Sequence, residues 1–346
     1  MTTTANIPLD RIATIDMAPL DDGSAAGKRQ VADAFRAVFE RVGFFILVNH
    51  GVDTGLIKRT FAEAARFHAQ PMDAKLAVMM NEHNNGYMAM NRYNVRTSRV
   101  SEEAKPDRNE SFFMKRERGP DDPLLKSGRK FVGANVWPRD LPGFRETLLE
   151  YTDAVDLMAK RLLGPLALSL DLPEDHFDAG FAESQFSLRL SHYPPVEPRE
   201  DQEAREVRGA PQYGIAPHTD SSFMTFLAQS GVPGLQIRVD EENWLDVPHV
   251  PDSFVVNSGD MLHRWTNGHY KSTPHRALPP TGQTRYAIPF FFGPHFDTTI
   301  ECLPSCHGPD NPPQFPPITY GDYMTWWYGS NYDAKDQADL ATEAAE

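Results

Sequence analysis

Apolar residues recur every three or four positions in three stretches of the first half of the chain. This period predicts amphipathic helices over residues 28–42, about 54–69 and about 142–172. Gly43 is expected to end the first helix and Pro71 the second. Between them, the apolar run at residues 44–48 is rich in aromatic and β-branched side chains, which predicts a short strand.

From residue 186 onward the pattern changes to short strand-like runs that glycine, proline and asparagine separate. The runs cover residues 186–193, 224–228, 235–239, 244–247, 253–257 and 286–292. Their roughly ten-residue spacing predicts a β-sandwich or barrel, so the expected fold class is mainly β with flanking α-helices. A last helix is expected from about residue 320, with Tyr323, Trp326 and Trp327 on one apolar face.

The hydrophobic pattern divides the chain into three parts. Residues 1–175 are expected to form a helical and irregular region that packs on the core and does not fold separately. Residues 176–300 supply the β-rich core, and residues 301–346 a loop, the aromatic helix and a polar tail. Within the first part, residues 80–130 are polar and lack a clear hydrophobic periodicity. They either cover an active site or form an exposed surface loop.

The composition narrows the class of protein. With 346 residues, 40% of them hydrophobic, the chain is long enough for a sizeable core, and its net charge of −14 argues against nucleic acid as a partner. No apolar run approaches the roughly 18 residues of a membrane span, and the start lacks the basic and apolar regions of a signal peptide. With Cys302 and Cys306 interpreted as reduced thiols, we expect a cytoplasmic protein of unspecified oligomeric state.

Two histidines and one aspartate in the second half are candidate metal ligands. His218 and Asp220 alternate by two, so both side chains face one side of a strand, and His275 follows 55 residues later. Two imidazoles and one carboxylate can occupy one face of an octahedral metal and leave three positions open, which suits non-haem Fe(II) and O₂. The alternative is that all three are surface polar residues, and His263 competes for the place of the third ligand.

A charged residue opens the last apolar run. Arg285 stands ten residues after His275, at the head of Arg285-Tyr-Ala-Ile-Pro-Phe-Phe. A buried guanidinium needs a partner, which is either a protein carboxylate or the carboxylate of a ligand. Tyr193, in a neighbouring predicted strand, could add a phenolic hydrogen bond to that ligand.

Motifs along nearly the whole chain resemble those of the isopenicillin N synthase-like family of Fe(II)/2-oxoglutarate dioxygenases. In chain order they are Val42-Gly-Phe-Phe-Ile-Leu-Val-Asn-His-Gly, Glu110-Ser-Phe, Asn135-Val-Trp-Pro, Pro217-His-Thr-Asp, Leu235-Gln-Ile, Val256-Asn-Ser-Gly-Asp, Thr273-Pro-His-Arg and Arg285-Tyr-Ala-Ile-Pro-Phe-Phe. The resemblance implies a double-stranded β-helix (jelly roll) for residues 176–300. The site residues that it implies are His218, Asp220 and His275 for Fe(II), and Arg285, Tyr193, Ser191 and Ala287 around 2-oxoglutarate.

The sequence departs from the family pattern at two of these positions. The family usually has serine where this chain has Ala287, so one hydroxyl contact to 2-oxoglutarate is missing. Ser191 replaces a common asparagine and can still form a hydrogen bond.

The implied activity is oxidation of a C–H bond of a small organic molecule, with 2-oxoglutarate and O₂ converted to succinate and CO₂. Hydroxylation is the expected outcome. Desaturation or ring closure requires only that the substrate bind in another orientation. Two alternatives are an oxidase of the isopenicillin N synthase type, which uses no 2-oxoglutarate, and a non-catalytic jelly roll that binds a small molecule. The residues expected to line the substrate pocket are Tyr87, Met88, Arg92, Phe112, Phe113, His263, Phe290, Phe292 and Trp326.

Overall fold

The computed structural model describes residues 12–91, 106–196, 212–240 and 243–331. Within these residues, one large sheet has the strand order β1 (Ala13–Asp16), β2 (Phe44–Val48), β10 (Phe254–Ser258), β7 (Met224–Gln229), β12 (Arg285–Gly293), β5 (Gln185–Tyr193), β4 (Glu110–Lys115) and β3 (Gly86–Met88). A smaller sheet has the order β6 (Ile215–His218), β11 (His275–Ala277), β8 (Leu235–Arg238) and β9 (Trp244–Asp246), and β13 (Thr299–Ile300) pairs with β14 (Ile318–Thr319). Neighbouring strands are antiparallel except β1 and β2.

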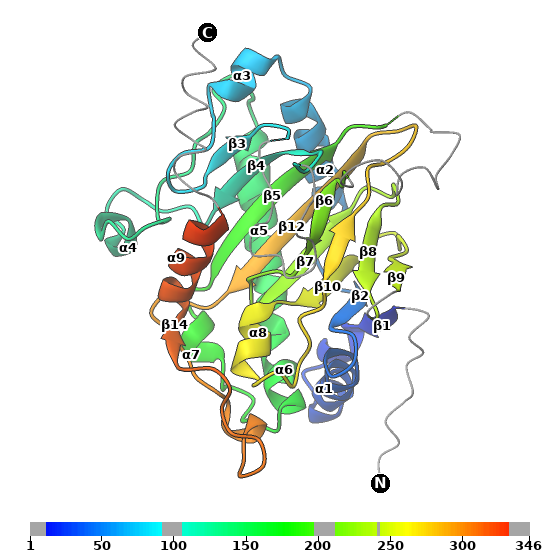
Figure 1. Ribbon diagram of the computed structural model, residues 1–346, viewed down its shortest axis with the longest axis vertical. Coiled ribbons are helices and arrows are strands. Elements are labelled where there is room, and N and C mark those ends of the chain that lie inside the picture. Colours follow the sequence, from blue (N-terminus) through cyan, green and yellow to red (C-terminus); the bar gives the residue numbers. More distant parts are fainter. Residues whose placement is uncertain (1–11, 92–105, 197–211, 241–242, 332–346) are drawn as a thin grey trace.

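Helices cover the face of the large sheet that lies away from the small sheet (Figure 1). The helices that form this layer are α1 (Ala25–Phe39), α2 (Thr54–His68), α5 (Phe144–Arg161) and α6 (Leu163–Ser169). Shorter helices stand at the ends of strands and in loops: α3 (Met72–Leu76), α4 (Pro123–Lys126), α7 (Asp178–Phe181) and α8 (Asp260–Trp265). The last helix, α9 (Tyr320–Asn331), lies beside that end of the large sheet at which β5 begins and β12 ends (Figure 1). None of the described helices is both long enough and apolar enough to cross a bilayer.

The predicted helices form, with ends that local chemistry sets. Ser24 caps α1 by accepting a hydrogen bond from the backbone of Gly27, and Asp53 caps α2 in the same way from Gly55. The third predicted helix divides into α5 and α6 after Arg161, and the second piece carries Pro165 in its first turn. Proline has no N–H for the preceding turn, so a break at this place is expected.

Side-chain alternation along β12 separates the core from the interior of the barrel. Ile288, Phe290 and Phe292 belong to the hydrophobic core beneath the helices. Odd-numbered residues of β12, which include Arg285 and Phe291, line cavities on the opposite face of the sheet. Because successive side chains of a strand point to opposite faces, one face of the sheet builds the core and the other builds the site.

The polar segment at residues 80–130 is more regular than its sequence indicates. It contains β3 and β4, and β4 pairs antiparallel with β5 from Glu110 to Lys115. Two other strands, β6 and β11, are not among the predicted apolar runs because each is very short, although the alternation of His218 and Asp220 indicates a strand at β6. The expectation of an irregular segment was therefore wrong for residues 86–88 and 110–115, which are strands of the large sheet.

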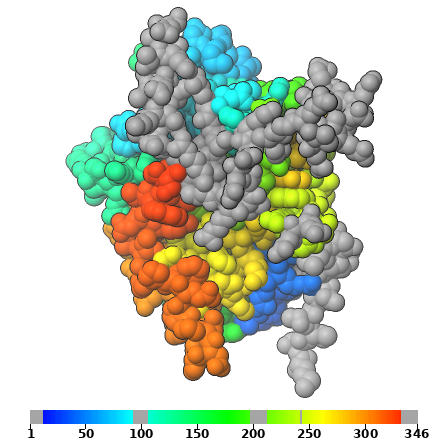
Figure 2. All heavy atoms as spheres, viewed as in Figure 1, coloured from blue at the N-terminus to red at the C-terminus, as the bar shows by residue number. Residues whose placement is uncertain are grey.

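The loop between β13 and β14 projects from one end of the molecule and is orange in Figure 2. It contains both cysteines, and neither forms a disulfide. Cys306 is buried, and burial raises the pKa of its thiol. Both properties agree with the interpretation of reduced thiols.

Candidate active site

The small sheet places two candidate ligands side by side. His218 ends β6 and His275 begins β11, and the two residues are direct partners in the antiparallel pair. Their ring centroids lie 4.3 Å apart. Asp220 stands beyond the end of β6, and its Oδ1 lies 3.7 Å from Nε2 of His218 and 3.6 Å from Nε2 of His275. One ligand atom from each residue therefore points to a common position.

Backbone carbonyls fix the orientation of both histidine rings. Nδ1 of His218 lies 2.8 Å from the carbonyl oxygen of Ala216, and Nδ1 of His275 lies 3.2 Å from that of Thr273. A carbonyl oxygen can only accept, so Nδ1 carries the proton in each neutral ring and Nε2 presents a lone pair. Burial lowers the pKa of His218 to about 4, with repulsion from His275 adding to the effect, so His218 is neutral at physiological pH.

Asp220 is ionised and held by two neutral donors. Burial alone would raise its pKa, but His275, His218 and the hydroxyl of Thr225 together outweigh that effect and keep the pKa below its usual range. Oδ2 accepts hydrogen bonds from the hydroxyl of Thr225 at 2.6 Å and from Nδ2 of Asn257 at 2.8 Å, which leaves Oδ1 for the common position. Burial lowers the pKa of His275, but Asp220 raises it above its usual value. A divalent cation at the common position would bind Oδ1 and the two Nε2 atoms in place of a proton. The donor set fits Fe(II).

A second feature lies behind this position, at the head of β12. Arg285 has 1% of its surface exposed, and its Nε and Nη1 have no hydrogen-bond partner among the described residues. The guanidinium lies over the ring of Tyr193, its partner on β5, with 4.7 Å from Cζ to the ring centroid. A narrow pocket connects Arg285 with His218, Asp220 and His275. Because a buried arginine without an anion is costly, this pocket fits the distal carboxylate of 2-oxoglutarate.

The other expected cosubstrate residues lie on the same strands. Ala287 lines the pocket wall, two residues after Arg285. Ser191 pairs with Ala287 across the strands and is buried, but its hydroxyl lies 3.4 Å from that of Ser111 and not in the pocket wall. The wall also contains Arg189 and Arg276, but these guanidinium groups donate hydrogen bonds to Ser111, Asn109 and Gln236, whereas Nε and Nη1 of Arg285 have no partner among the described residues.

A larger cavity opens on the other side of the three ligands, and its wall includes His218 and Asp220. Of the residues predicted for the substrate pocket, Phe113 lines this cavity. Additional aromatic walls come from Phe131, Phe186, Phe291, Phe296, Tyr320, Trp327 and Tyr328. A mostly apolar wall next to a metal position is a suitable place for a small organic substrate.

The remaining predicted pocket residues lie elsewhere. Phe112, Phe290 and Phe292 face the opposite side of their strands, in the hydrophobic core, while their neighbours Phe113 and Phe291 face the cavity. Tyr87 and Met88 are buried in β3 outside the cavity wall, and Trp326 is 57% exposed on α9, with Trp327 in the wall instead. His263 lies in α8, where its Nδ1 contacts the carbonyl of Tyr270 at 2.7 Å, and Arg92 falls outside the described residues.

Sequence reasoning missed several residues of the site. Thr225, which holds Asp220, lies in no motif, and Asn257 lies in the motif Val256-Asn-Ser-Gly-Asp, from which no contact with Asp220 was predicted. Arg189 was also missed, although it precedes Tyr193 by four positions and so shares its face of β5. The interruption of the apolar run Phe186-Ser-Leu-Arg-Leu by an arginine was the available signal.

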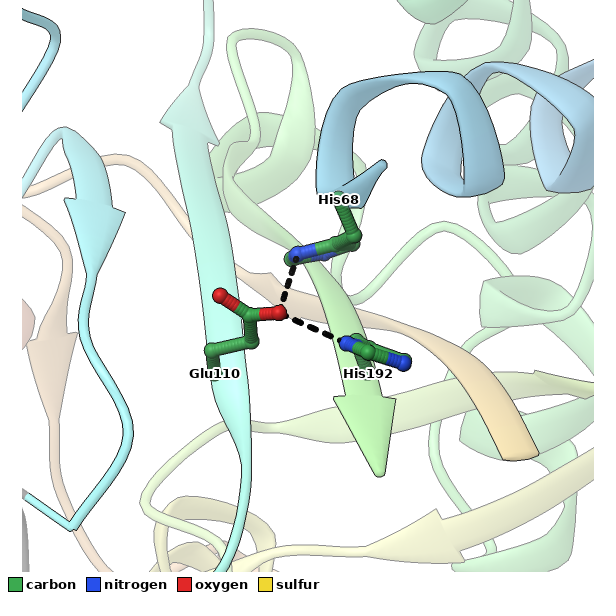
Figure 3. A group of neighbouring side chains, drawn as sticks. All are labelled: His68, Glu110 and His192. Atoms are coloured by element: carbon green, nitrogen blue, oxygen red, sulfur yellow. Dashed lines mark hydrogen bonds and ion pairs between the residues drawn. The ribbon is translucent and has the colours of Figure 1, made fainter. Parts of the chain in front are cut away.

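A second group of histidines and a carboxylate lies on the helix-covered side of the sheet (Figure 3). His68 ends α2, Glu110 begins β4 and His192 stands near the end of β5. Oε1 of Glu110 accepts from Nδ1 of His192 at 2.7 Å and lies 3.6 Å from Nδ1 of His68. Oε2 accepts from Nζ of Lys75 at 2.8 Å and from the hydroxyl of Tyr87. Because the Lys75 ammonium already neutralises this carboxylate, we interpret the group as a structural cluster complete without a metal.

Glu110→Gln should therefore destabilise the fold strongly. The change removes the anion and leaves the buried ammonium of Lys75 unpaired, a loss of about 3–5 kcal/mol in the free energy of unfolding. Burial would raise the pKa of Glu110, but hydrogen bonds led by that from His192 hold it below its usual range. The stabilisation is then complete above the pKa of the unfolded chain and lost as the pH falls below about 5. Chemical denaturation across this pH range measures both effects.

Glu150→Gln is the matched control for that experiment. Glu150 pairs with Arg59 at 3.0 Å, but both side chains are at least half exposed. An exposed pair contributes about 0–1 kcal/mol, so this variant should unfold almost as the wild type does. Equal stability of the two variants would contradict the structural role of the Glu110 cluster.

Comparisons with known proteins show the family to which the chain belongs. Residues 184–294 match the family model described as the 2OG-Fe(II) oxygenase superfamily, and residues 12–140 match the N-terminal model of non-haem dioxygenases described from morphine synthesis. The 2-oxoglutarate-Fe(II) type oxidoreductase hxnY of Emericella nidulans is 35% identical over 324 residues, which cover 92% of this chain and 89% of the relative. The chain belongs to the 2OG-Fe(II) oxygenase superfamily. It is an Fe(II)- and 2-oxoglutarate-dependent dioxygenase that oxidises small molecules.

Solved structures extend the likeness to the fold. A full-length protein of Neurospora crassa, solved in complex with alpha-KG, has a TM-score of 0.77 and 27% sequence identity, and the match covers 91% of this chain and 95% of that one. The complex of JOX2 with 2OG, Fe and JA has a TM-score of 0.73 and 28% identity, covering 91% and 84%. These structures confirm the predicted double-stranded β-helix with flanking helices.

Proposed function

We propose that His218, Asp220 and His275 bind Fe(II), that Arg285 and Tyr193 hold the distal carboxylate of 2-oxoglutarate, and that the aromatic cavity holds the substrate. The observation that carries this proposal is the meeting of two Nε2 lone pairs with Oδ1 of Asp220. The narrow pocket that runs from this position to Arg285 supports the same assignment, because Nε and Nη1 of Arg285 have no hydrogen-bond partner among the described residues.

The protein's own contribution is orientation and exclusion of water. The Ala216 and Thr273 carbonyls hold the two rings, and Thr225 and Asn257 hold Asp220 through its other oxygen. Such outer partners typically change metal affinity about 10- to 100-fold. Bound Fe(II) and 2-oxoglutarate supply the O₂-dependent oxidation of a C–H bond, with succinate and CO₂ as coproducts.

Hydroxylation of a small organic molecule is the proposed outcome. Related structures were solved with thymine, in the Neurospora crassa protein, and with JA, in JOX2, so small organic ligands enter sites of this fold. We place the reaction in the cytoplasm and without a nucleic-acid partner, an assignment that the net charge of −14 and the two free thiols support.

The test is 2-oxoglutarate turnover by the purified protein after anaerobic addition of Fe(II). Succinate should form only when Fe(II), 2-oxoglutarate and O₂ are all present, and a cavity ligand should raise the rate. O₂ consumption with a substrate but without 2-oxoglutarate would contradict the proposal and favour an oxidase of the isopenicillin N synthase type.

A further inference from the structure

One arginine stands between the two cavities of the site. Arg189, in the middle of β5, is 6% exposed and lines both the narrow cosubstrate pocket and the larger aromatic cavity. Its guanidinium lies over the ring of Phe113, with 5.1 Å from Cζ to the ring centroid. Phe113 lines the larger cavity and not the cosubstrate pocket, so the guanidinium of Arg189 contacts a residue of the substrate side.

The hydrogen-bond partners of Arg189 are neutral. Nε donates to the hydroxyl of Ser111 at 2.8 Å, and Nη2 donates to Oδ1 of Asn109 at 2.5 Å. These bonds use two of the five N–H groups of a guanidinium, and the other three form no hydrogen bond with the described residues. No carboxylate among the described residues forms an ion pair with Arg189. Two fixed neutral acceptors orient the fork without cancelling its charge.

The acidic side chain that interacts electrostatically with Arg189 is a poor counter-ion. Asp107 interacts electrostatically with Arg189, but its Oδ1 accepts a hydrogen bond from the backbone of Ala216 at 2.8 Å and its Oδ2 has no partner among the described residues. Burial raises the pKa of Asp107 to about 7, so this carboxyl group is partly protonated at physiological pH.

The other arginines of the cavity wall differ, because carboxylates already hold them. Arg116 pairs with Asp156 at 3.0 Å, and Arg118 pairs with Asp122 at 2.7 Å and with Glu183 at 2.9 Å. Among the described residues of the wall, the sole carboxylate is the candidate iron ligand Asp220. Arg189 is therefore the cavity arginine that is free to bind an anion.

We propose that Arg189 binds the carboxylate of the substrate, and that the substrate is a small aromatic carboxylic acid. The three remaining N–H groups can donate hydrogen bonds to both oxygens of a carboxylate. Phe113 beside the guanidinium and Phe291 across the wall provide apolar surfaces for a flat ring. This inference rests on the proposed function, which assigns the larger cavity to the substrate and Arg285 to the cosubstrate.

The experiment measures binding and needs no turnover. The protein, loaded with Mn(II) in place of Fe(II) and with 2-oxoglutarate, is titrated calorimetrically with two matched pairs, benzoate with benzamide and phenylacetate with phenylacetamide. Each acid has almost the shape of its amide, so the ratio of affinities reports the charge that the cavity prefers. The wild type should bind the acids at least about tenfold more tightly than the amides, a difference of about 1.4 kcal/mol.

Variants assign that preference to one residue. Arg189→Gln should abolish the preference for the acid, and Arg189→Lys, which keeps the charge but not the planar fork, should retain part of it. Arg118→Gln is the matched control, because Arg118 already pairs with two carboxylates, and it should keep the full preference. Should Arg189→Gln fail to fold, as circular dichroism would show, the comparison of Arg189→Lys with Arg118→Gln decides.

Three results would overturn the inference. They are equal affinity of the wild type for acids and amides, absence of binding by all the acids, and an unchanged preference in Arg189→Gln or, where that variant does not fold, in Arg189→Lys. A loss of 2-oxoglutarate affinity without a loss of acid preference would assign Arg189 to the cosubstrate instead. Each of these results is compatible with normal 2-oxoglutarate-dependent succinate formation, so the inference can fail while the proposed function stands.

Discussion

Asp220→Ala is expected to abolish succinate formation and to release the iron. The variant loses the one anionic ligand of the site, and it leaves Thr225 and Asn257 without their acceptor. Loss of an outer partner of a metal ligand costs about 10- to 100-fold in affinity, so loss of the ligand itself should cost more than roughly 100-fold. Iron content after anaerobic dialysis and succinate formation under saturating 2-oxoglutarate measure the two effects.

Two further variants make this test specific. His263→Ala should keep its iron, because His263 lies in α8 with its ring against the Tyr270 carbonyl and outside both cavity walls. Thr225→Val should weaken iron binding by about 10- to 100-fold, since one hydrogen bond to Asp220 is removed. Retention of full activity by Asp220→Ala would exclude it as a ligand.

Arg285→Leu should raise the KM for 2-oxoglutarate by roughly 30-fold or more, with iron still bound. The guanidinium is buried, and its Nε and Nη1 have no hydrogen-bond partner among the described residues, so a bound carboxylate would be its main electrostatic contact. Truncation of a buried, charge-assisted pair costs on the order of 2–5 kcal/mol, and about 1.4 kcal/mol corresponds to tenfold. Titration of succinate formation with 2-oxoglutarate gives the KM directly.

Other substitutions in the same pocket should change the affinity for 2-oxoglutarate by smaller amounts. Arg285→Lys should restore only part of the affinity, because lysine lacks the planar fork. Ala287→Ser should tighten binding by about 1 kcal/mol if its hydroxyl reaches the carboxylate, since Ala287 lines the same pocket wall. A KM that Arg285→Leu leaves unchanged would place the cosubstrate elsewhere.

Much of the fold could be predicted because its long elements have clear periods. The strand Phe44–Val48 formed with the predicted bounds, and the predicted helices differ from the observed ones at their ends and in the division of the third after Arg161. The candidate ligands could be found because their residue types are rare together and their spacing limits the geometry. The structure brings His218, Asp220 and His275 together, although Asp220 lies beyond its strand and not within it.

The substrate pocket could not be predicted in the same way, because alternation carries no signal in a uniformly apolar strand. In the run Phe290-Phe-Phe, all three side chains are equally hydrophobic, so the sequence does not show that Phe291 alone faces the cavity. Phe112 and Phe113 present the same ambiguity. The short strands β6 and β11 depend on tertiary pairing, which a local pattern does not record.

The most direct test of the central claim is the number of Fe(II) ions that each of three proteins binds per chain in anaerobic dialysis. The wild type should bind one, His275→Ala none, and His192→Ala, which alters the other histidine–carboxylate cluster, should still bind one. Both variants remove a buried or half-buried histidine that contacts a carboxylate, so they are matched in kind. Iron retained by His275→Ala and lost by His192→Ala would place the metal at Glu110 and contradict the account.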